Sequence, residues 1–197
     1  MKILVTGFAG FIGFHLTKKL IETGHIEWGI DNFNDYYEIS LKYDWINQLG
    51  ISASALIDGQ LIQSDKFPAL QCLRADISEI NQIKFLFDNA QPDIVCHLAA
   101  QAGVRYSLEN PRVYADTNLM GFFNVLDAAG ESGIKHFIYA NSSSVYGLNE
   151  KFPLEESDSV DHRVSLYAAT KRSNEFMVHA YSHLYNIPTT GLRSFTE

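Results

Sequence analysis

Cysteine is scarce in this sequence, and long apolar runs are missing. The 197 residues include two cysteines, Cys72 and Cys96, each within an apolar stretch, and no CxxC pair occurs. The sequence therefore offers no disulfide framework and no cysteine-based zinc site, and we expect buried, reduced thiols in a cytoplasmic protein. The apolar run after Lys2 is too short for a signal peptide, and none approaches the roughly 20 residues that span a bilayer.

Basic residues are also few. Lys and Arg number 15 against 23 Asp and Glu, which gives a net charge of −8 at pH 7. A chain this acidic repels a phosphate backbone, so we exclude a nucleic-acid partner, although main-chain amides can still hold one small anion. His179 and His183 lie four residues apart with no third ligand nearby. We expect a pair on a helix surface and no metal site.

Short apolar runs alternate with amphipathic segments along the whole chain. Strands are expected at 2–6, 26–30, 70–74, 94–98, 136–140 and 189–193. Helices are expected at 11–23, 39–49, 79–89, 111–130 and 165–185, and the remainder of 33–66 resembles an insertion. This alternation predicts an α/β fold in one domain: a Rossmann-like, doubly wound parallel sheet in the order 3-2-1-4-5-6, with helices on both faces.

Three glycines follow the first strand at a GxxGxxG spacing and open the first helix. Gly7 lets the chain turn sharply, Gly10 lets the backbone approach a pyrophosphate, and Gly13 lets the helix pack close to the sheet. The helix N-terminus presents free N–H groups to phosphate. Such a pattern alone is often only a tight turn, but its place between a strand and a helix predicts a dinucleotide site.

An acidic residue ends the second strand. Asp31 lies eighteen residues beyond Gly13, close to the separation of about 20 that is typical of a ribose-binding carboxylate. It can accept both ribose hydroxyls and would repel a 2′-phosphate, which favours NAD over NADP; the alternative is a turn-capping aspartate. Asp76 ends the third strand similarly and is a candidate for the adenine edge. Three aromatic residues either cover the adenosine or pack the insertion: Tyr36, Tyr37 and Trp45.

Tyr167 and Lys171 are spaced i, i+4 and therefore share one face of the last helix. A tyrosine titrates near 10, and we expect the nearby ammonium to lower that pKa so that the phenol can accept a proton while hydride leaves the same carbon. A serine run, Ser142 to Ser144, follows the fifth strand at the edge where ligands bind, and its hydroxyls can share that proton. The alternatives are a surface Tyr/Lys pair and a polar turn.

Five segments together resemble the extended short-chain dehydrogenases/reductases: 6–13, 98–105, Asn118, 142–147 and 167–171. Three longer segments, 31–37, 100–107 and 161–171, are similar to nucleotide-sugar 4-epimerases of the UDP-glucuronate 4-epimerase type. The resemblance covers essentially the whole chain. It implies that Tyr167 removes the C4 hydroxyl proton, that hydride passes to tightly held NAD, and that the resulting 4-keto sugar takes hydride back on its other face.

The resemblance also assigns roles residue by residue. It implies Ser142, Tyr167 and Lys171 as the catalytic set, and Arg105, Ser142 and Ser143 as substrate contacts, although Arg105 can equally form a surface salt bridge. The implied NAD contacts, besides Tyr167 and Lys171, are Gly7, Gly10, Phe11, Ile12, Gly13, Asp31, Asn32, Asp76, Ile77, Leu98, Ala99, Ala100, Gln101 and Asn118. The resemblance also implies a homodimer interface at helices 111–130 and 165–185, although their outward apolar residues could equally cover a missing C-terminal domain. Residues 1–197 would form the NAD-binding domain.

The chain departs from the family pattern in three places. Related dehydratases carry an Asp-Glu pair where this chain has Ser143 and Ser144, which argues against elimination of water. Asn141 stands where a small residue is more usual. Family members continue into a C-terminal domain that binds the nucleotide, which we expect to be absent here because the chain stops at Glu197. The alternatives to a UDP-glucuronate-type 4-epimerase are therefore a truncated, non-catalytic NAD-binding module and a 4-epimerase of another UDP-hexose.

Overall fold

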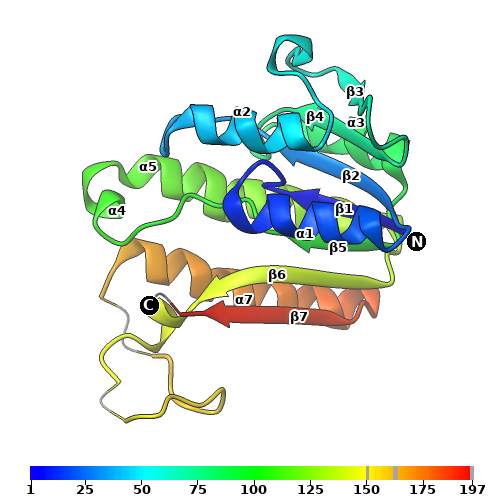
Figure 1. The fold of residues 1–197 in the computed structure, drawn as a ribbon. Helices are drawn as coiled ribbons and strands as arrows, with labels where there is room; N and C mark the ends of the chain where they lie inside the picture. Colours follow the sequence, from blue (N-terminus) through cyan, green and yellow to red (C-terminus); the bar gives the residue numbers. More distant parts are fainter. Residues whose placement is uncertain (150, 162–163, 196–197) are drawn as a thin grey trace.

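A seven-stranded sheet forms the centre of the molecule, in the order β3-β4-β2-β1-β5-β6-β7 (Figure 1). The computed structural model describes residues 1–149, 151–161 and 164–195. The strands are β1 (Lys2–Thr6), β2 (Ile26–Asp31), β3 (Leu61–Gln63), β4 (Leu70–Arg74), β5 (Ile94–His97), β6 (His136–Ser142) and β7 (Thr189–Ser194). The α-helices are α1 (Phe11–Glu22), α2 (Ile39–Gln48), α3 (Ile80–Ala90), α4 (Tyr106–Glu109), α5 (Pro111–Tyr114), α6 (Phe122–Ser132) and α7 (Leu166–Tyr185).

The six predicted strands pair in parallel in the predicted 3-2-1-4-5-6 order, which confirms the doubly wound fold. The prediction missed β3, which pairs antiparallel with β4 at one edge of the sheet. This strand lies within the segment that resembled an insertion. It has only three residues, none of them fully buried, so it is too short to show the alternating pattern that identifies a strand.

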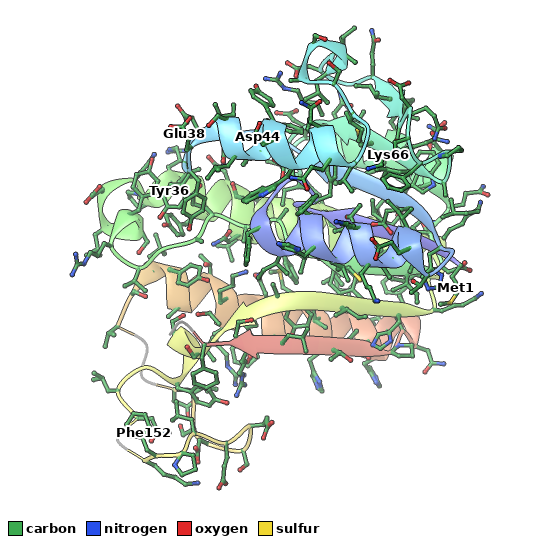
Figure 2. The ribbon with its side chains drawn as sticks, viewed as in Figure 1. Met1, Tyr36, Glu38, Asp44, Lys66 and Phe152 are labelled. Carbon is green, nitrogen blue, oxygen red and sulfur yellow. The ribbon has the colours of Figure 1, made fainter. Side chains whose placement is uncertain are left out.

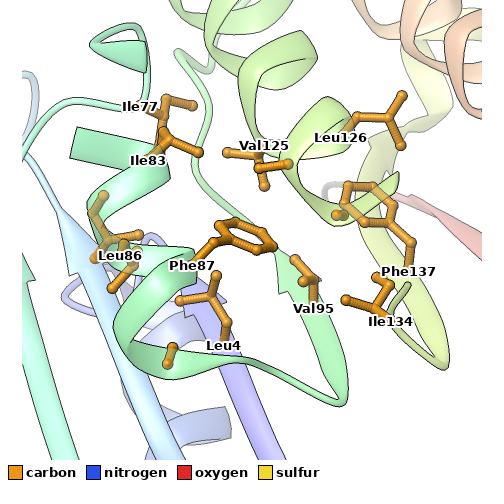
Figure 3. Close-up of a cluster of buried hydrophobic side chains, with 14 of the residues drawn as sticks. Leu4, Ile77, Ile83, Leu86, Phe87, Val95, Val125, Leu126, Ile134 and Phe137 are labelled. Carbon is orange, nitrogen blue, oxygen red and sulfur yellow. The ribbon is translucent and has the colours of Figure 1, made fainter. Parts of the chain in front are cut away.

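Helices cover both faces of the sheet, and each face has its own apolar core. Helices α1 and α2 lie in front of the sheet in Figure 1, where Phe14 and Ile46 pack with Val5. Figure 3 shows the other core, in which α3 and α6 pack onto the strands. Its labelled side chains are Leu4, Ile77, Ile83, Leu86, Phe87, Val95, Val125, Leu126, Ile134 and Phe137.

The helix predicted at 111–130 is not regular. It begins with Pro111 in the first turn, as expected, but it widens into a π-helical segment, η2 (Ala115–Gly121), before α6 continues. Asn118 lies in this segment and is buried. Wide π-turns interrupt the usual hydrogen-bond ladder and often occur at functional sites, and the sequence pattern gave no sign of this one.

The parallel strands all end at the same edge of the sheet, on the left in Figure 1. The glycine loop after β1, the turn after β2 and the start of α7 lie on this edge. Two short 3₁₀ segments, η1 (Ala53–Ala55) and η3 (Ser143–Tyr146), complete the described elements. Across the described ranges, no helix combines the length and the apolar character that a membrane span requires.

Candidate active site

A cavity of about 620 Å³ opens along this edge, between the glycine loop, the end of β2, α2 and the loop after β5. Most of the predicted NAD contacts line it: Gly7, Gly10, Phe11, Ile12, Gly13, Asp31, Asn32, Ile77, Leu98, Ala99, Ala100 and Gln101. The other predicted contacts do not line this cavity: Asp76, Asn118, Tyr167 and Lys171. The cavity is also lined by Tyr36, Tyr37 and Trp45, so these aromatic residues lie on the predicted adenosine side.

The glycine loop has the geometry of a phosphate cradle. Gly7 has a φ of +73°, and a Cβ there would lie 2.9 Å from the main-chain nitrogen of Ala99. A Cβ at Gly13 would overlap the carbonyl oxygen of Gly7, so α1 packs against the loop only because this residue is glycine. Gly10 caps α1 without a side-chain acceptor. The N–H groups of the first helical turn therefore remain available for an anion.

Asp31 caps the turn after β2 and also lines the cavity, and its contact with a ribose stays a prediction. Its Oδ1 accepts from the main-chain nitrogen of Phe33 at 2.8 Å. The same oxygen accepts from the ammonium of Lys42 at 3.3 Å, and both side chains are buried. Lys42 donates as well to Asn34 at 3.2 Å. Sequence reasoning missed Lys42, and its only signal was a lysine on the inward face of the 39–49 helix.

Asp76 does not line the main cavity itself but holds Asn32, which does. Its Oδ2 accepts from the side-chain amide of Asn32 at 2.7 Å, and its Oδ1 accepts from the main-chain nitrogen of Ser78 at 2.9 Å. Burial raises its pKa, but these hydrogen bonds outweigh burial and hold the pKa below its ordinary value. Asp76 lines a separate polar pocket of about 380 Å³ and orients Asn32, which lines the main cavity. Figure 2 shows Glu38 at the start of α2 and Tyr36 below it, where its ring packs on Tyr106 of α4.

The structure brings Ser142, Tyr167 and Lys171 together where α7 passes the end of β6. The Ser142 hydroxyl faces the phenol of Tyr167 and acts to lower its pKa. Lys171 is buried, and its ammonium donates to the main-chain oxygen of Ala140 at 3.0 Å. Ala140 lines the cavity, so the three side chains adjoin the predicted cofactor site. The predicted strand ended at residue 140, whereas β6 extends to Ser142.

The proton affinities of this cluster differ from the prediction. Burial raises the pKa of Tyr167, the nearby Ser142 hydroxyl offsets part of that rise, and Tyr37 adds to it. The expected lowering of this pKa by Lys171 is not seen, and the Lys171 ammonium donates to the Ala140 carbonyl. Burial also lowers the pKa of Lys171 to about 8.

Asn118 supports the cavity wall instead of lining it. Its Oδ1 accepts from the main-chain nitrogen of Gln101 at 2.8 Å, and its Nδ2 donates to the main-chain oxygen of the same residue at 3.0 Å. A further wall residue, Tyr114, was not predicted. Its hydroxyl donates to the main-chain oxygens of Ala102 at 2.5 Å and Gly103 at 2.6 Å, and its ring lies 6.1 Å from that of Tyr167.

The predicted substrate contacts lie outside the cavity. Arg105 is exposed at the start of α4, and the described residues offer its guanidinium no ion pair. Ser143 is half-buried at the start of η3. Of the segments that carried the resemblance, His162 and Arg163 lie outside the described residues, as do Thr196 and Glu197 at the end of the chain.

Curated relatives with this sequence pattern include Protein CapI of Staphylococcus aureus, which is 52% identical over 196 residues. A probable UDP-glucuronate 4-epimerase of Rhizobium meliloti is 44% identical over 196 residues. The matches cover 100% of this chain but 54% and 53% of those proteins. The chain therefore spans about half the length of the curated relatives it matches.

Solved structures with a similar fold include the UDP-glucuronic acid 4-epimerase of Bacillus cereus in complex with UDP-glucuronic acid and NAD. The match has a TM-score of 0.81 and 32% identity, and it covers 98% of this chain and 56% of that one. The UDP-glucose 4-epimerase of Thermus thermophilus in complex with NAD matches with a TM-score of 0.78 and 27% identity, over 98% of this chain and 54% of that one.

The family profile that matches is described as the NAD dependent epimerase/dehydratase family, and it covers residues 3–196. This match spans the glycine loop, the cavity and the Ser142, Tyr167 and Lys171 cluster. The chain belongs to the NAD-dependent epimerase/dehydratase family.

Proposed function

We propose that residues 1–197 form the NAD-binding domain of a nucleotide-sugar 4-epimerase that interconverts UDP-glucuronate and UDP-galacturonate. The observation that carries the proposal is the side-chain cluster beside the glycine-loop cavity. In it the Ser142 hydroxyl faces Tyr167, and the Lys171 ammonium donates to Ala140. Relatives named as UDP-glucuronate 4-epimerases support the substrate class. Proteins that share the fold act on several sugars, so the site and not the fold has to support the reaction.

The cavity suits NAD. The uncapped first turn of α1 would hold the pyrophosphate, and Asp31 would accept a ribose hydroxyl. Bound NAD would supply a reversible hydride acceptor. Lys171 would hold the nicotinamide ribose and, when that ribose replaces part of its contact with Ala140, would stabilise the charged form of Tyr167.

Tyr167 is the group that moves the proton. In the proposed reaction its phenolate takes the proton of the sugar C4 hydroxyl while hydride leaves C4, and a transient 4-keto sugar forms. The Ser142 hydroxyl faces the phenol, lowers its pKa and would stabilise its charged form. The raised pKa of Tyr167 keeps the phenol protonated until the cofactor and Lys171 lower it, which confines base strength to the loaded enzyme.

The residues beside Ser142 favour epimerisation over dehydration. Elimination of water needs an acid and a base next to the keto sugar, and Ser143 and Ser144 provide neither. Arg105 is exposed at the same edge and would meet an anionic group of the substrate, for which we propose the sugar carboxylate or the UDP phosphates. Ser143 would contact the sugar from η3.

Two further properties stay predictions. The outer faces of the helices at 111–130 and 165–185 carry exposed Met120, Phe176 and Leu184, which supports a homodimer through these helices. The expectation of a cytoplasmic protein rests on the sequence alone. The competing functions are a non-catalytic NAD-binding module and a 4-epimerase of another UDP-hexose.

The test is to incubate the full-length protein with UDP-glucuronate and to separate UDP-galacturonate by chromatography. We expect interconversion in the wild type, no product from Tyr167→Phe, and wild-type rates from Tyr185→Phe, which changes a tyrosine at the far end of α7. Preferred turnover of UDP-glucose or an N-acetylhexosamine would select the other-hexose alternative. Binding of NAD without turnover of any UDP-sugar would select the non-catalytic module.

A further inference from the structure

Asn141 bridges the catalytic end of β6 to the middle of α7. Its side chain is buried, with the residue 4% exposed. The amide nitrogen donates to Oε1 of Glu175 at 2.5 Å, and the amide oxygen accepts from the main-chain nitrogen of Ser142 at 2.8 Å. A single side chain therefore joins a carboxylate on the helix to the backbone of the serine that contacts Tyr167.

Glu175 is itself held in place. The guanidinium of Arg193, on β7, donates to Oε1 at 2.8 Å and to Oε2 at 3.1 Å, and Arg172 donates to Oε2. Burial raises the pKa of Glu175, but the hydrogen bonds from Arg193 and Arg172 outweigh it and hold the pKa below its ordinary value. An ionised carboxylate accepts hydrogen bonds only, so it dictates which end of the Asn141 amide faces it. The amide oxygen is left to face Ser142.

The contact belongs to a repeated pattern along α7. Tyr167, Lys171 and Glu175 lie four residues apart, on one side of the helix. They meet three consecutive residues of β6: Lys171 donates to Ala140, Glu175 accepts from Asn141, and Tyr167 faces Ser142. Figure 1 shows α7 lying along β6 and β7, as these contacts require. The helix that carries the base thus also fixes the strand that carries the serine.

We propose that Asn141 and Glu175 are positioning residues that set the direction of the Ser142 hydroxyl toward Tyr167. Ser142 Oγ also accepts from the main-chain nitrogen of Ser144 at 3.2 Å, so its lone pairs are already oriented from one side. The Asn141 amide holds the Ser142 backbone from the other side. An apolar small residue at this position, such as alanine, has no amide to make the link, so the device depends on the asparagine of this chain. The inference rests on the proposed function.

The experiment compares Asn141→Ala and Glu175→Gln with the wild type in the full-length protein. For Asn141→Ala we expect kcat to fall roughly tenfold or more, because small displacements of catalytic groups are costly, while KM stays within about twofold. The rising limb of the pH–kcat profile should move to higher pH, because Ser142 no longer lowers the pKa of Tyr167 as effectively. Glu175→Gln keeps an acceptor for Asn141 and should retain more activity. Asn89→Ala, on the surface of α3, should behave as the wild type.

A second measurement is independent of turnover. Amide hydrogen exchange at Ser142, followed in the NAD-free protein, should be faster in Asn141→Ala than in the wild type, because its acceptor is lost. Unchanged exchange at Ser142, or an unchanged kcat and pH profile in an active enzyme, would overturn the positioning role. A wild type that turns over no UDP-sugar but shows the exchange difference would reject the proposed function and retain the geometric link. If Asn141→Ala does not fold, Asn141→Ser replaces it in both measurements.

Discussion

The ammonium of Lys171 donates to the main-chain oxygen of Ala140 at 3.0 Å, and no carboxylate of the described residues forms an ion pair with it. Lys171 is 3% exposed, so its positive charge is almost entirely removed from water. Burial therefore lowers the pKa of the ammonium to about 8. Helix α7 therefore holds a destabilised cation beside the glycine-loop cavity, and groups with perturbed pKa values of this kind cluster at functional sites.

Lys171→Met should stabilise the protein at neutral pH. The pKa of Lys171 is about 8 in the folded chain against an ordinary 10.5. The unfolded chain binds the proton more tightly, so the burial cost is present in full below pH 8 and fades as the pH rises toward 10.5. We expect the free energy of unfolding to rise by about 2 kcal/mol at pH 7, after the lost hydrogen bond to Ala140 is deducted, and by less at pH 10. Urea unfolding at both pH values measures it; a variant less stable than wild type at pH 7 contradicts it.

The wild type should lose stability as the pH rises from acidic to neutral, and Glu27→Gln should remove much of that loss. Glu27 on β2 is fully buried, and burial raises its pKa to about 9, although a hydrogen bond from Thr17 opposes the rise. The folded chain keeps a proton that the unfolded chain releases above about 4.5, so stability falls as the pH rises from there to 9. Glutamine has the same shape and no charge. We expect the free energy of unfolding of Glu27→Gln to exceed that of the wild type by a few kcal/mol at pH 8 and by little at pH 4.5. Urea unfolding across this pH range measures the difference. A difference that stays constant with pH would contradict the prediction.

The two alanine variants of the glycine loop should separate folding from binding. Gly13→Ala places a methyl group against the Gly7 carbonyl, and we expect a loss of about 3 kcal/mol in the free energy of unfolding. In Gly10→Ala the Cβ lies 3.2 Å from the same oxygen and the φ of −81° suits alanine. The latter variant should fold normally yet bind NAD at least roughly tenfold more weakly, because the methyl group occupies the approach to the pyrophosphate. Thermal unfolding measures the stability of both variants, and NAD titration calorimetry measures their affinity for NAD. A wild-type NAD affinity in Gly10→Ala would contradict the role of the glycine loop in binding pyrophosphate.

Asp31→Asn should weaken the preference for NAD over NADP. The amide can still accept from Phe33, but the charge that repels a 2′-phosphate is gone and the Lys42 ammonium is left without its counter-charge. We expect the ratio of the two affinities to fall at least roughly tenfold. Lys42→Met added to Asp31→Asn should reduce the gain for NADP, and Asp58→Asn, an exposed acid, should change nothing. An unchanged affinity ratio in Asp31→Asn would remove Asp31 from the cofactor site.

Local patterns were sufficient for the frame of the molecule and for the catalytic spacing. Burial of parallel strands makes them continuous apolar runs, so six strands and their order followed from the alternation. Glycine is required at positions 7 and 13 because other backbone atoms come close to both residues. The spacing of the glycines in the sequence indicates this requirement directly. Tyr167 and Lys171 share a helical face because of the helical period, and that period is a local property.

The tertiary structure alone decided how these parts are connected. The links from Lys42 to Asp31, from Asn118 to Gln101 and from Glu175 to Asn141 join segments that no local period relates. The raised pKa of Tyr167 depends on how deeply the phenol is buried, and spacing from Lys171 does not determine that depth. Sequence periodicity reports which face a residue shares, whereas hydrogen-bond partners and desolvation arise only when distant segments pack together.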